Sequence, residues 1–256
     1  MVTAAPTDIP PGTQTLARGL AVIRAVADGA HDLRAVVERT GLGRSTAHRL
    51  IQLLVHEGYL RSGHRGYTLG PALIELGFKA LHGNPLPVVA RPILEELSAK
   101  VLDTVHLAVE DDGSVLYLDK LSGSRGAEMR SRVGYRMPLT RAGVGKALLL
   151  DSAPRWAALF AADNARVADG KGGDATEFLA RMTEYARIGA SLDLEDNEPG
   201  IRCVAAPIRD ASRNIVGAIS VSATTPYMPA ERMRGLIPVV RQAAGRISTD
   251  LGYRED

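Results

Sequence analysis

Residues 33–58 read LRAVVERTGLGRSTAHRLIQLLVHEG, and this stretch decides the fold of the N-terminal part of the chain. Apolar side chains recur at helical spacing over 33–39 and again over 44–57, which predicts a short helix and a longer one. Asp32 is the expected N-cap of the first helix, and the turn 40–43, with two glycines, separates the two. A short helix, a glycine turn and a longer helix form the layout of a helix-turn-helix.

The flanking sequence extends this unit on both sides. Two β-prone runs that follow the longer helix have the signature of a hairpin, which would be the wing of a winged helix-turn-helix. The remaining predictions for this part, in chain order, are a disordered leader over 1–14, a helix over 15–28 with apolar Leu16, Leu20, Val22, Ile23 and Val26, hairpin strands over 59–61 and 67–69 around the tip 62–66, and a linker helix over 72–81.

The polar side chains of the longer helix suit DNA. Arg, Ser, Thr and His reach phosphates and base edges in a major groove, and a helix N-terminus favours phosphate. Residues 13–66 hold eight Arg against four acidic residues, so this part carries +4 while the chain as a whole carries +2. A protein-interaction module with a solvated polar face remains the alternative. The candidate DNA-binding residues are Arg18, Arg44, Ser45, Thr46, His48, Arg49, His64 and Arg65.

The pattern changes after residue 84, where strands and helices interleave. Such a mixture, with several hairpin-type turns, favours an α+β fold in which helices cover an antiparallel sheet. The predicted helices are 85–101, 145–150, 155–162, 177–188 and 230–251, the last with a bend expected at Pro238. The predicted strands are 104–110, 114–121, 128–133, 203–209 and 214–223.

Composition excludes several classes of protein. The chain has 256 residues, of which 45% are hydrophobic and 23% charged, which is typical of a folded domain and not of a disordered, collagen-like or disulfide-stapled chain. Cys203 is the only cysteine, so no intrachain disulfide forms. Neither a transmembrane run nor a signal peptide is evident. We therefore expect a cytoplasmic protein without a membrane partner.

Three groups in the second part carry candidate chemistry. The run 141–147, RAGVGKA, lacks the first Gly and the final Ser or Thr of a phosphate loop, so it is either a helix start whose free N–H groups hold a carboxylate or a tight turn before a buried helix. The acidic cluster Asp193, Glu195, Asp196 and Glu198 is expected to be solvated or to cap a turn. Cys203 lies in an apolar run typical of an inert core residue, although a nucleophile is the alternative. No metal motif and no cofactor are predicted.

Several longer segments resemble one family. TLARGLAVIRAVADGAHDLRAVVERTGLGRSTAHRLIQLLVHEGYL (15–60) and GYTLGPALIELG (66–77) resemble the N-terminal half of IclR-type transcriptional regulators, and DKLSGSRGAEMRSRVGYRMPLTRAGVGKALL (119–149), EPGIRCVAAPIRD (198–210) and NIVGAISVSA (214–223) resemble their effector-binding domain. Such proteins often carry Glu where this sequence has Asp196. The resemblance implies a winged helix-turn-helix over 15–70, a linker helix over 71–84, and a GAF/profilin-like α/β domain over 85–256 that binds an effector and oligomerises. It also implies homodimers or tetramers on palindromic operators.

In similar regulators the positions matching Asp193, Cys203, Ser220 and Ser222, with backbone of Gly143 and Val144, line the ligand pocket. Ser220 and Ser222 alternate along one strand and so share a face. Apolar walls from Met129, Met137 and Ile201 would suit the carbon skeleton of a small keto acid or aromatic acid. Asp193 would repel an anion unless it is protonated, so it is expected to accept a hydrogen bond from a ligand hydroxyl. The leading hypothesis is a ligand-responsive regulator; the alternative is an enzyme that uses Cys203, with His106 as the available base.

Overall fold

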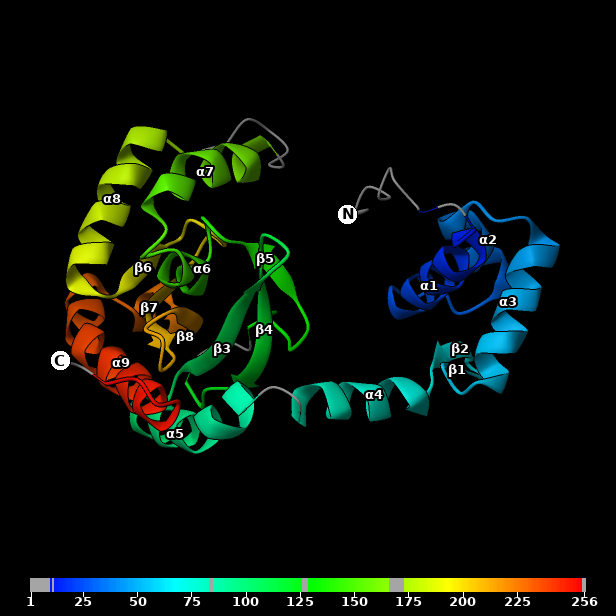
Figure 1. The fold of residues 1–256 in the computed structure, drawn as a ribbon, viewed down its shortest axis with the longest axis horizontal. Helices are drawn as coiled ribbons and strands as arrows, with labels where there is room; N and C mark the ends of the chain where they lie inside the picture. The colour runs from blue at the N-terminus through cyan, green and yellow to red at the C-terminus, as the bar shows by residue number, and fades with distance from the viewer. Residues whose placement is uncertain (1–9, 11, 83–84, 126–128, 166–172, 255–256) are drawn as a thin grey trace. The chain divides into compact units, whose positions relative to one another are not determined.

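The computed structural model describes residues 10, 12–82, 85–125, 129–165 and 173–254. The chain divides into two compact units, residues 1–83 and 84–256 (Figure 1). Most of the predicted leader, 1–9 and 11, lies outside the described residues, as does the Asn84 boundary. Among the residues described, no helix is long and apolar enough to cross a membrane.

The first unit is a helical bundle with a hairpin. Its elements are α1 (Gln14–Ala27), α2 (Leu33–Thr40), α3 (Arg44–His56), β1 (Leu60–Gly63), β2 (Gly66–Leu69) and α4 (Pro71–His82). Asp32 Oδ1 accepts a hydrogen bond from the Ala35 N–H at 2.8 Å, which confirms the predicted cap. Gly41 ends α2 in the left-handed conformation that glycine adopts without strain. The core contains Val22, Ala25, Val26, Ala30, Val36, Ala47, Leu50, Ile51 and Leu60.

The core of the first unit covers only part of the apolar surface of α1. Val22 and Val26 are buried, but Leu16 and Leu20 are 66% and 45% exposed. Two of the five apolar residues of the predicted helix therefore lie outside the core. The three helices of one small unit offer too little surface to cover the first two turns of α1.

The hairpin is docked on the turn between α1 and α2. The Tyr67 N–H donates to the His31 carbonyl at 2.7 Å, and His31 Nδ1 lies 3.0 Å from the Tyr67 carbonyl oxygen. Gly66 has a φ of +85°, and a Cβ there would lie 2.0 Å from the same His31 oxygen. Only glycine permits this approach, and it sets the direction of the predicted wing.

The second unit is built on a six-stranded antiparallel sheet. Its strands are β3 (Thr104–Asp111), β4 (Ser114–Leu121), β5 (Arg136–Pro138), β6 (Ser191–Leu194), β7 (Ile201–Arg209) and β8 (Ile215–Thr224), in the order β5-β4-β3-β8-β7-β6. The α+β prediction, with helices covering an antiparallel sheet, is confirmed. The helices are α5 (Pro85–Val101), α6 (Gly143–Leu148), α7 (Trp156–Ala165), α8 (Ala175–Ile188) and α9 (Ala230–Asp250).

Two layers of helices lie on opposite faces of the sheet (Figure 1). One core joins α5 and α9 to Val105, Leu107, Ile219 and Val221, and the other joins α6, α7 and α8 to Ala108, Ala205 and Ala218. Adjacent strand positions therefore alternate between the two cores, as the pleat requires.

One strand prediction is wrong in its described part, and one strand was not predicted. Residues 129–133 form no strand; β5 begins at Arg136, and Glu128 lies outside the described residues. The carbonyls of Met129 and Ser131 each accept a hydrogen bond from Lys120 Nζ at 2.7 Å, so a side chain and not a neighbouring strand satisfies them. The short strand β6 was not predicted, because four residues with Ser191 and Asp193 on one face carry little β signal.

Candidate functional site

The candidate DNA-binding side chains lie mainly on one helix. Arg44, Ser45, His48 and Arg49 of α3 are exposed and Thr46 is half-buried, while Ala47, Leu50 and Ile51 of the same helix are buried. Arg44, Ser45 and His48 also line a shallow hollow next to Leu33 of α2. His64 and Arg65 are exposed at the hairpin tip, and Arg18 is exposed on α1.

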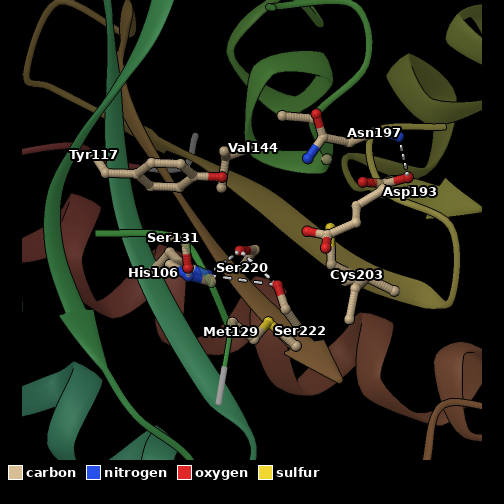
Figure 2. Close-up of a pocket in the computed structure, with 14 residues that line it drawn as sticks. His106, Tyr117, Met129, Ser131, Val144, Asp193, Asn197, Cys203, Ser220 and Ser222 are labelled. Atoms are coloured by element: carbon tan, nitrogen blue, oxygen red, sulfur yellow. Dashed lines mark hydrogen bonds between the residues drawn. The ribbon is translucent and has the colours of Figure 1, made fainter. Parts of the chain in front are cut away.

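A cavity lies in the second unit, between the sheet and the start of α6 (Figure 2). Its space, open solvent at the mouth included, is about 430 Å³. The predicted residues that line it are Met129, Gly143, Val144, Asp193, Ile201, Cys203, Ser220 and Ser222. The others are His106, Tyr117, Ser131, Ala142, Asn197 and Glu198.

Met137 is the predicted pocket residue that does not line this cavity. It pairs with Val115 in the β4–β5 register and packs, half-buried, against the core beneath α6, α7 and α8. Its strand, β5, forms the edge of the sheet. The structure therefore does not bring Met137 to this cavity together with the other predicted residues.

The strand register brings the polar residues together. His106 of β3 pairs with Ser220 of β8, and Ser222 pairs with Cys203 of β7, which pairs in turn with Asp193 of β6. All five side chains are buried on the face that α6 covers. Residues 114 positions apart in the chain thus share one wall of the cavity.

Gly143 places the start of α6 against the sheet. A Cβ at this position would lie 2.2 Å from Cys203 Sγ, so no larger residue fits without movement. Ser191 Oγ donates to the Gly143 carbonyl at 2.8 Å and fixes the position of the helix on β6. Ala142, Gly143 and Val144 line the cavity, and all six residues of α6 are buried, so the structure is consistent with both alternatives for residues 141–147.

Asp193 is a buried carboxyl with one oxygen already occupied. Its Oδ1 accepts hydrogen bonds from the Asp196 N–H at 2.8 Å and from the Asn197 N–H at 3.4 Å. Burial raises the pKa of Asp193 to about 6, with a further contribution from the Asp196 charge, while Lys146 and the two backbone donors oppose the shift. Near neutral pH this carboxyl is therefore close to its protonation equilibrium.

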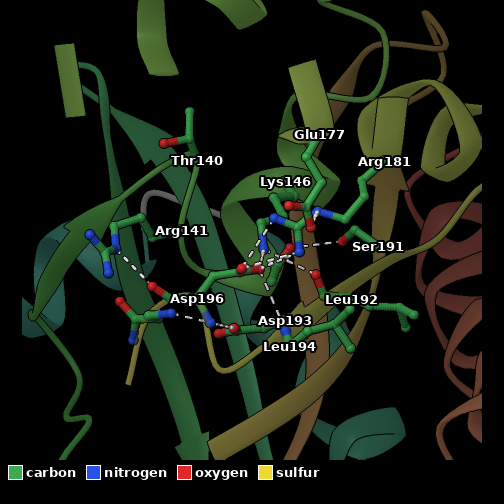
Figure 3. Close-up of polar contacts among 12 residues, drawn as sticks. Thr140, Arg141, Lys146, Glu177, Arg181, Ser191, Leu192, Asp193, Leu194 and Asp196 are labelled. Atoms are coloured by element: carbon green, nitrogen blue, oxygen red, sulfur yellow. Dashed lines mark hydrogen bonds and ion pairs between the residues drawn. The ribbon is translucent and has the colours of Figure 1, made fainter. Parts of the chain in front are cut away.

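A charged network behind the cavity holds the loop after β6 (Figure 3). Lys146 of α6 is 1% exposed, pairs with Asp196, and donates to the Leu192 carbonyl at 3.1 Å. Arg181 of α8 makes two-pronged hydrogen bonds to the same Asp196 carboxylate, and Arg141 Nε donates to the Asp196 carbonyl at 2.8 Å. Asp196 is thus the anchor of the loop that carries Asn197 and Glu198 to the cavity.

This network corrects the prediction of a solvated acidic cluster. Asp193 belongs to β6 and is 4% exposed, and Asp196 is paired with two cations. The capping role is seen at Asp193, and also at Glu195, whose Oε2 accepts from the Gly200 N–H at 3.0 Å. No group of three or more possible metal-binding side chains occurs in the described part of the chain.

Sequence reasoning missed His106, Tyr117 and Ser131 as cavity residues. The alternation of Thr104, His106 and Ala108 against Val105 and Leu107 is visible in the sequence, and it puts His106 on one face. Which face carries a cavity depends on α6, which no local signal indicates. Ser131 reaches the site through the irregular segment that Lys120 holds.

The protonation states of Cys203 and His106 do not suit nucleophilic catalysis. Burial, with the nearby Asp193 charge, raises the pKa of the Cys203 thiol to about 12. Burial, with the charge of Lys120, lowers the pKa of His106 to about 3. At neutral pH the thiol is protonated, whereas the thiolate is the reactive form.

Comparison with known proteins decides the family. The description "IclR helix-turn-helix domain" matches residues 15–63, and "Bacterial transcriptional regulator IclR C-terminal" matches residues 78–249, more than half of the chain. The chain belongs to the IclR family. The prediction from the sequence segments is confirmed, and both the enzyme and the interaction-module alternatives give way to a DNA-binding, ligand-responsive transcriptional regulator.

Individual proteins similar to this chain support the family assignment. The DNA-binding transcriptional repressor YiaJ of Escherichia coli K12 is 29% identical over 253 residues, covering 95% of this chain and 90% of that protein. A putative transcriptional regulator from Rhodococcus sp. RHA1 is 32% identical with a TM-score of 0.81, covering 93% of this chain and 98% of that one. An IclR homologue from Microbacterium hydrocarbonoxydans, solved with 4-hydroxybenzoate, is 27% identical with a TM-score of 0.80 over 93% and 98% of the two chains.

Proposed function

We propose that this IclR-family regulator reads DNA with α3 and the hairpin, and that a small carboxylic acid in the cavity of the second unit changes its operator affinity. In this proposal residues 15–70 contact DNA, 71–84 link the units, and 85–256 bind the effector and oligomerise. The observation that carries the effector role is the buried cavity in which Asp193, Cys203, Ser220 and Ser222 converge on the start of α6.

The polar face of α3 supports the DNA role. Arg49 is exposed on the face of α3 opposite the buried Ala47 and Leu50, and Arg44 is exposed as the first residue of the helix. Both side chains are therefore available to phosphates or base edges. Arg18, Ser45, Thr46, His48, His64 and Arg65 complete the proposed DNA contacts.

The DNA role is tested with DNA duplexes selected from a random pool for binding to the full chain. Arg44→Ala and Arg49→Ala should each weaken binding, and each should reduce the slope of log affinity against log salt by about 1 if the side chain neutralises one phosphate. Arg34→Ala is the matched control, because Arg34 lies on α2 in an exposed pair with Glu38. An unchanged affinity in both α3 variants would refute the proposal.

The chemistry of the cavity supports an organic acid. Two serine hydroxyls, a protonated thiol and the backbone at the start of α6 offer donors, and Met129 and Ile201 offer apolar walls. The relative solved with 4-hydroxybenzoate adds support for an aromatic acid. A thermal-shift screen of keto acids, aromatic acids and their uncharged amides tests this, since a specific ligand raises the unfolding temperature. Stabilisation by uncharged compounds alone would overturn the effector class.

We also propose that two or four copies bind a palindromic operator. Leu16 and Leu20 on α1, with Ile74 and Phe78 on α4, are between 45% and 66% exposed, and exposed apolar side chains of this size favour a partner surface. Sedimentation at micromolar concentration should show a dimer or tetramer. A monomer that binds one half-site with undiminished affinity would contradict this.

A further inference from the structure

The cavity presents a problem for any anion. Its described lining contains two acidic side chains, Asp193 and Glu198, and neither Lys nor Arg. A carboxylate must therefore be held by neutral donors that point their hydrogens towards it. Ser220 and Ser222 are the hydroxyl donors among those proposed above, but a hydroxyl presents either its hydrogen or its lone pairs, depending on its other partner.

The hydroxyls of Ser220 and Ser222 lie 3.5 Å from each other, and both lie beside His106. Its Nδ1 lies 3.4 Å from Ser220 Oγ and 3.5 Å from Ser222 Oγ (Figure 2). A neutral imidazole has one N–H. If Nδ1 carries it, His106 donates to the serine oxygens and leaves a hydroxyl hydrogen for the ligand. If Nδ1 is unprotonated, the serine hydroxyls donate to it and present only lone pairs to the ligand.

Lys120 lies on the opposite side of the imidazole. It is the cross-strand partner of His106 in the β3–β4 register, and its Nζ donates to the carbonyls of Met129 and Ser131 at 2.7 Å. The Ser131 hydroxyl in turn lies 2.7 Å from His106 Nε2. The Lys120 ammonium on this side stabilises an Nε2 that carries a lone pair. It destabilises an Nε2 that carries a hydrogen, because the N–H would point its positive end towards the ammonium.

We propose that Lys120 holds His106 in the tautomer protonated on Nδ1, and that this tautomer turns the hydroxyl hydrogens of Ser220 and Ser222 towards a ligand carboxylate. Ser131 then donates to Nε2. Lys120 and His106 are positioning residues for the effector site, and they give it a preference for acceptor-only groups. The carboxylate ligand in this inference is taken from the proposed function. The assignment of the His106 tautomer does not depend on it.

The surroundings of His106 are consistent with a single neutral tautomer. Its side chain is buried, the Tyr117 ring packs at 5.0 Å between centroids, and Lys120 is the charged neighbour that shifts its equilibrium. Within the described part of the chain, the hydrogen-bonding partners of the ring are the three serine hydroxyls. None of these groups is an acid that would draw the proton to Nε2.

The tautomer is read directly by ¹⁵N NMR of the full chain labelled at histidine, with the His106 signal assigned by its absence in His106→Asn. We expect the proton on Nδ1 in the wild type and in the control Lys100→Met, which removes an exposed charge of the same unit. Lys120→Met should move the proton partly or wholly to Nε2, and Lys120→Arg should not. A wild-type proton on Nε2, or no response to Lys120→Met, would overturn the proposal.

Binding supplies the second readout, with benzoate and benzamide as matched probes. The wild type should prefer benzoate, and His106→Leu should lose about tenfold of its affinity. His106→Asn should retain most of it, because the Asn amide places an N–H near the position of Nδ1. Equal losses in the Leu and Asn variants would refute the donor role.

If no acid in the screen binds while the Nδ1 tautomer is observed, the proposed effector class fails and the tautomer assignment stands.

Discussion

Gly143 leaves room for a hydrogen atom and for nothing larger beside Cys203. A Cβ there would lie 2.2 Å from the sulfur, and the thiol is itself buried between Ser222 and Asp193. At the scale of single residues, the site depends on such close approaches as well as on polar chemistry. The absence of a side chain lets the start of α6 form part of the cavity wall.

We predict that Gly143→Ala pushes the Cys203 thiol into the cavity and weakens effector binding. The added methyl should lower the unfolding free energy by about 1–3 kcal/mol, the usual effect of overpacking. Gly235→Ala in α9 is the control, because nothing lies within 4 Å of its Cβ position. That control should be neutral or stabilising by about 0.5–1 kcal/mol, as for a helical glycine.

The double variant Gly143→Ala with Cys203→Ala separates the two effects. Removing the sulfur makes space for the methyl, so part of the lost stability should return in chemical denaturation. Additive losses in the double variant would show that the contact between these two residues is not the cause.

Asp193 predicts a pH dependence of stability. Its pKa in the folded protein is raised to about 6, from an ordinary value of 3.8. The folded state therefore binds the proton more tightly, so its contribution favours folding at low pH and is lost as pH rises through about 4 to 6. Asn keeps an acceptor for the Asp196 and Asn197 N–H groups and cannot ionise.

The melting temperature of Asp193→Asn should therefore rise relative to that of the wild type between pH 4 and pH 7. Above pH 7 the difference should stay constant. Burial lowers the pKa of His106, so its contribution to stability increases as pH rises. This contribution is the same in both proteins and cancels in the difference. Parallel melting curves across this range would contradict the assignment. Unchanged effector affinity in the variant would also exclude Asp193 as an acceptor for a ligand hydroxyl.

At the scale of elements, one carboxylate joins three of them. Asp196 follows β6 and binds Lys146 of α6 and Arg181 of α8. Residues 50 and 15 positions away in the chain meet at this point. Because Lys146 is 1% exposed, its ammonium depends on this partner.

We predict that Asp196→Ala lowers the unfolding free energy by about 3 kcal/mol, near the lower limit for breaking a buried pair. The value is low in the range because Asp196 is itself 22% exposed. Glu38→Ala, which breaks the exposed pair with Arg34 on α2, should have little effect. Equal effects of the two variants in urea unfolding would refute the role of the network.

Helices were easier to predict than strands in this chain. The bounds of α2, α3 and α5 agree with the prediction to within one residue, because apolar spacing, an Asp cap and Pro85 mark them locally. The strand expected over 128–133 did not form in its described part, since the Lys120 ammonium takes two of its carbonyls. β6 carried no local signal and is stabilised by pairing with β7.

At the scale of the whole molecule, the proposed function requires that the cavity and α3 influence each other, although they belong to different units. We predict that the effector and the operator affect each other's affinity by the same factor, typically about 5- to 150-fold, because coupling free energies are reciprocal. Titrations of the full chain with each ligand, in the absence and presence of the other, measure both factors. Arg49→Ala should lose operator binding and retain effector affinity. Unequal factors, or factors of one, would refute the coupling.

The sequence by itself determined the helix-turn-helix, the positions of its exposed Arg and Ser side chains, the α+β class of the second unit and the family. These depend on local periodicity, capping and turns, or on long segments shared with relatives. It did not determine that His106, Ser131 and Lys120 belong to the cavity and its support, or that Met137 lies outside it. Only the tertiary structure decided this, because cross-strand register sets which distant side chains face one another, and that register is not encoded in any single segment.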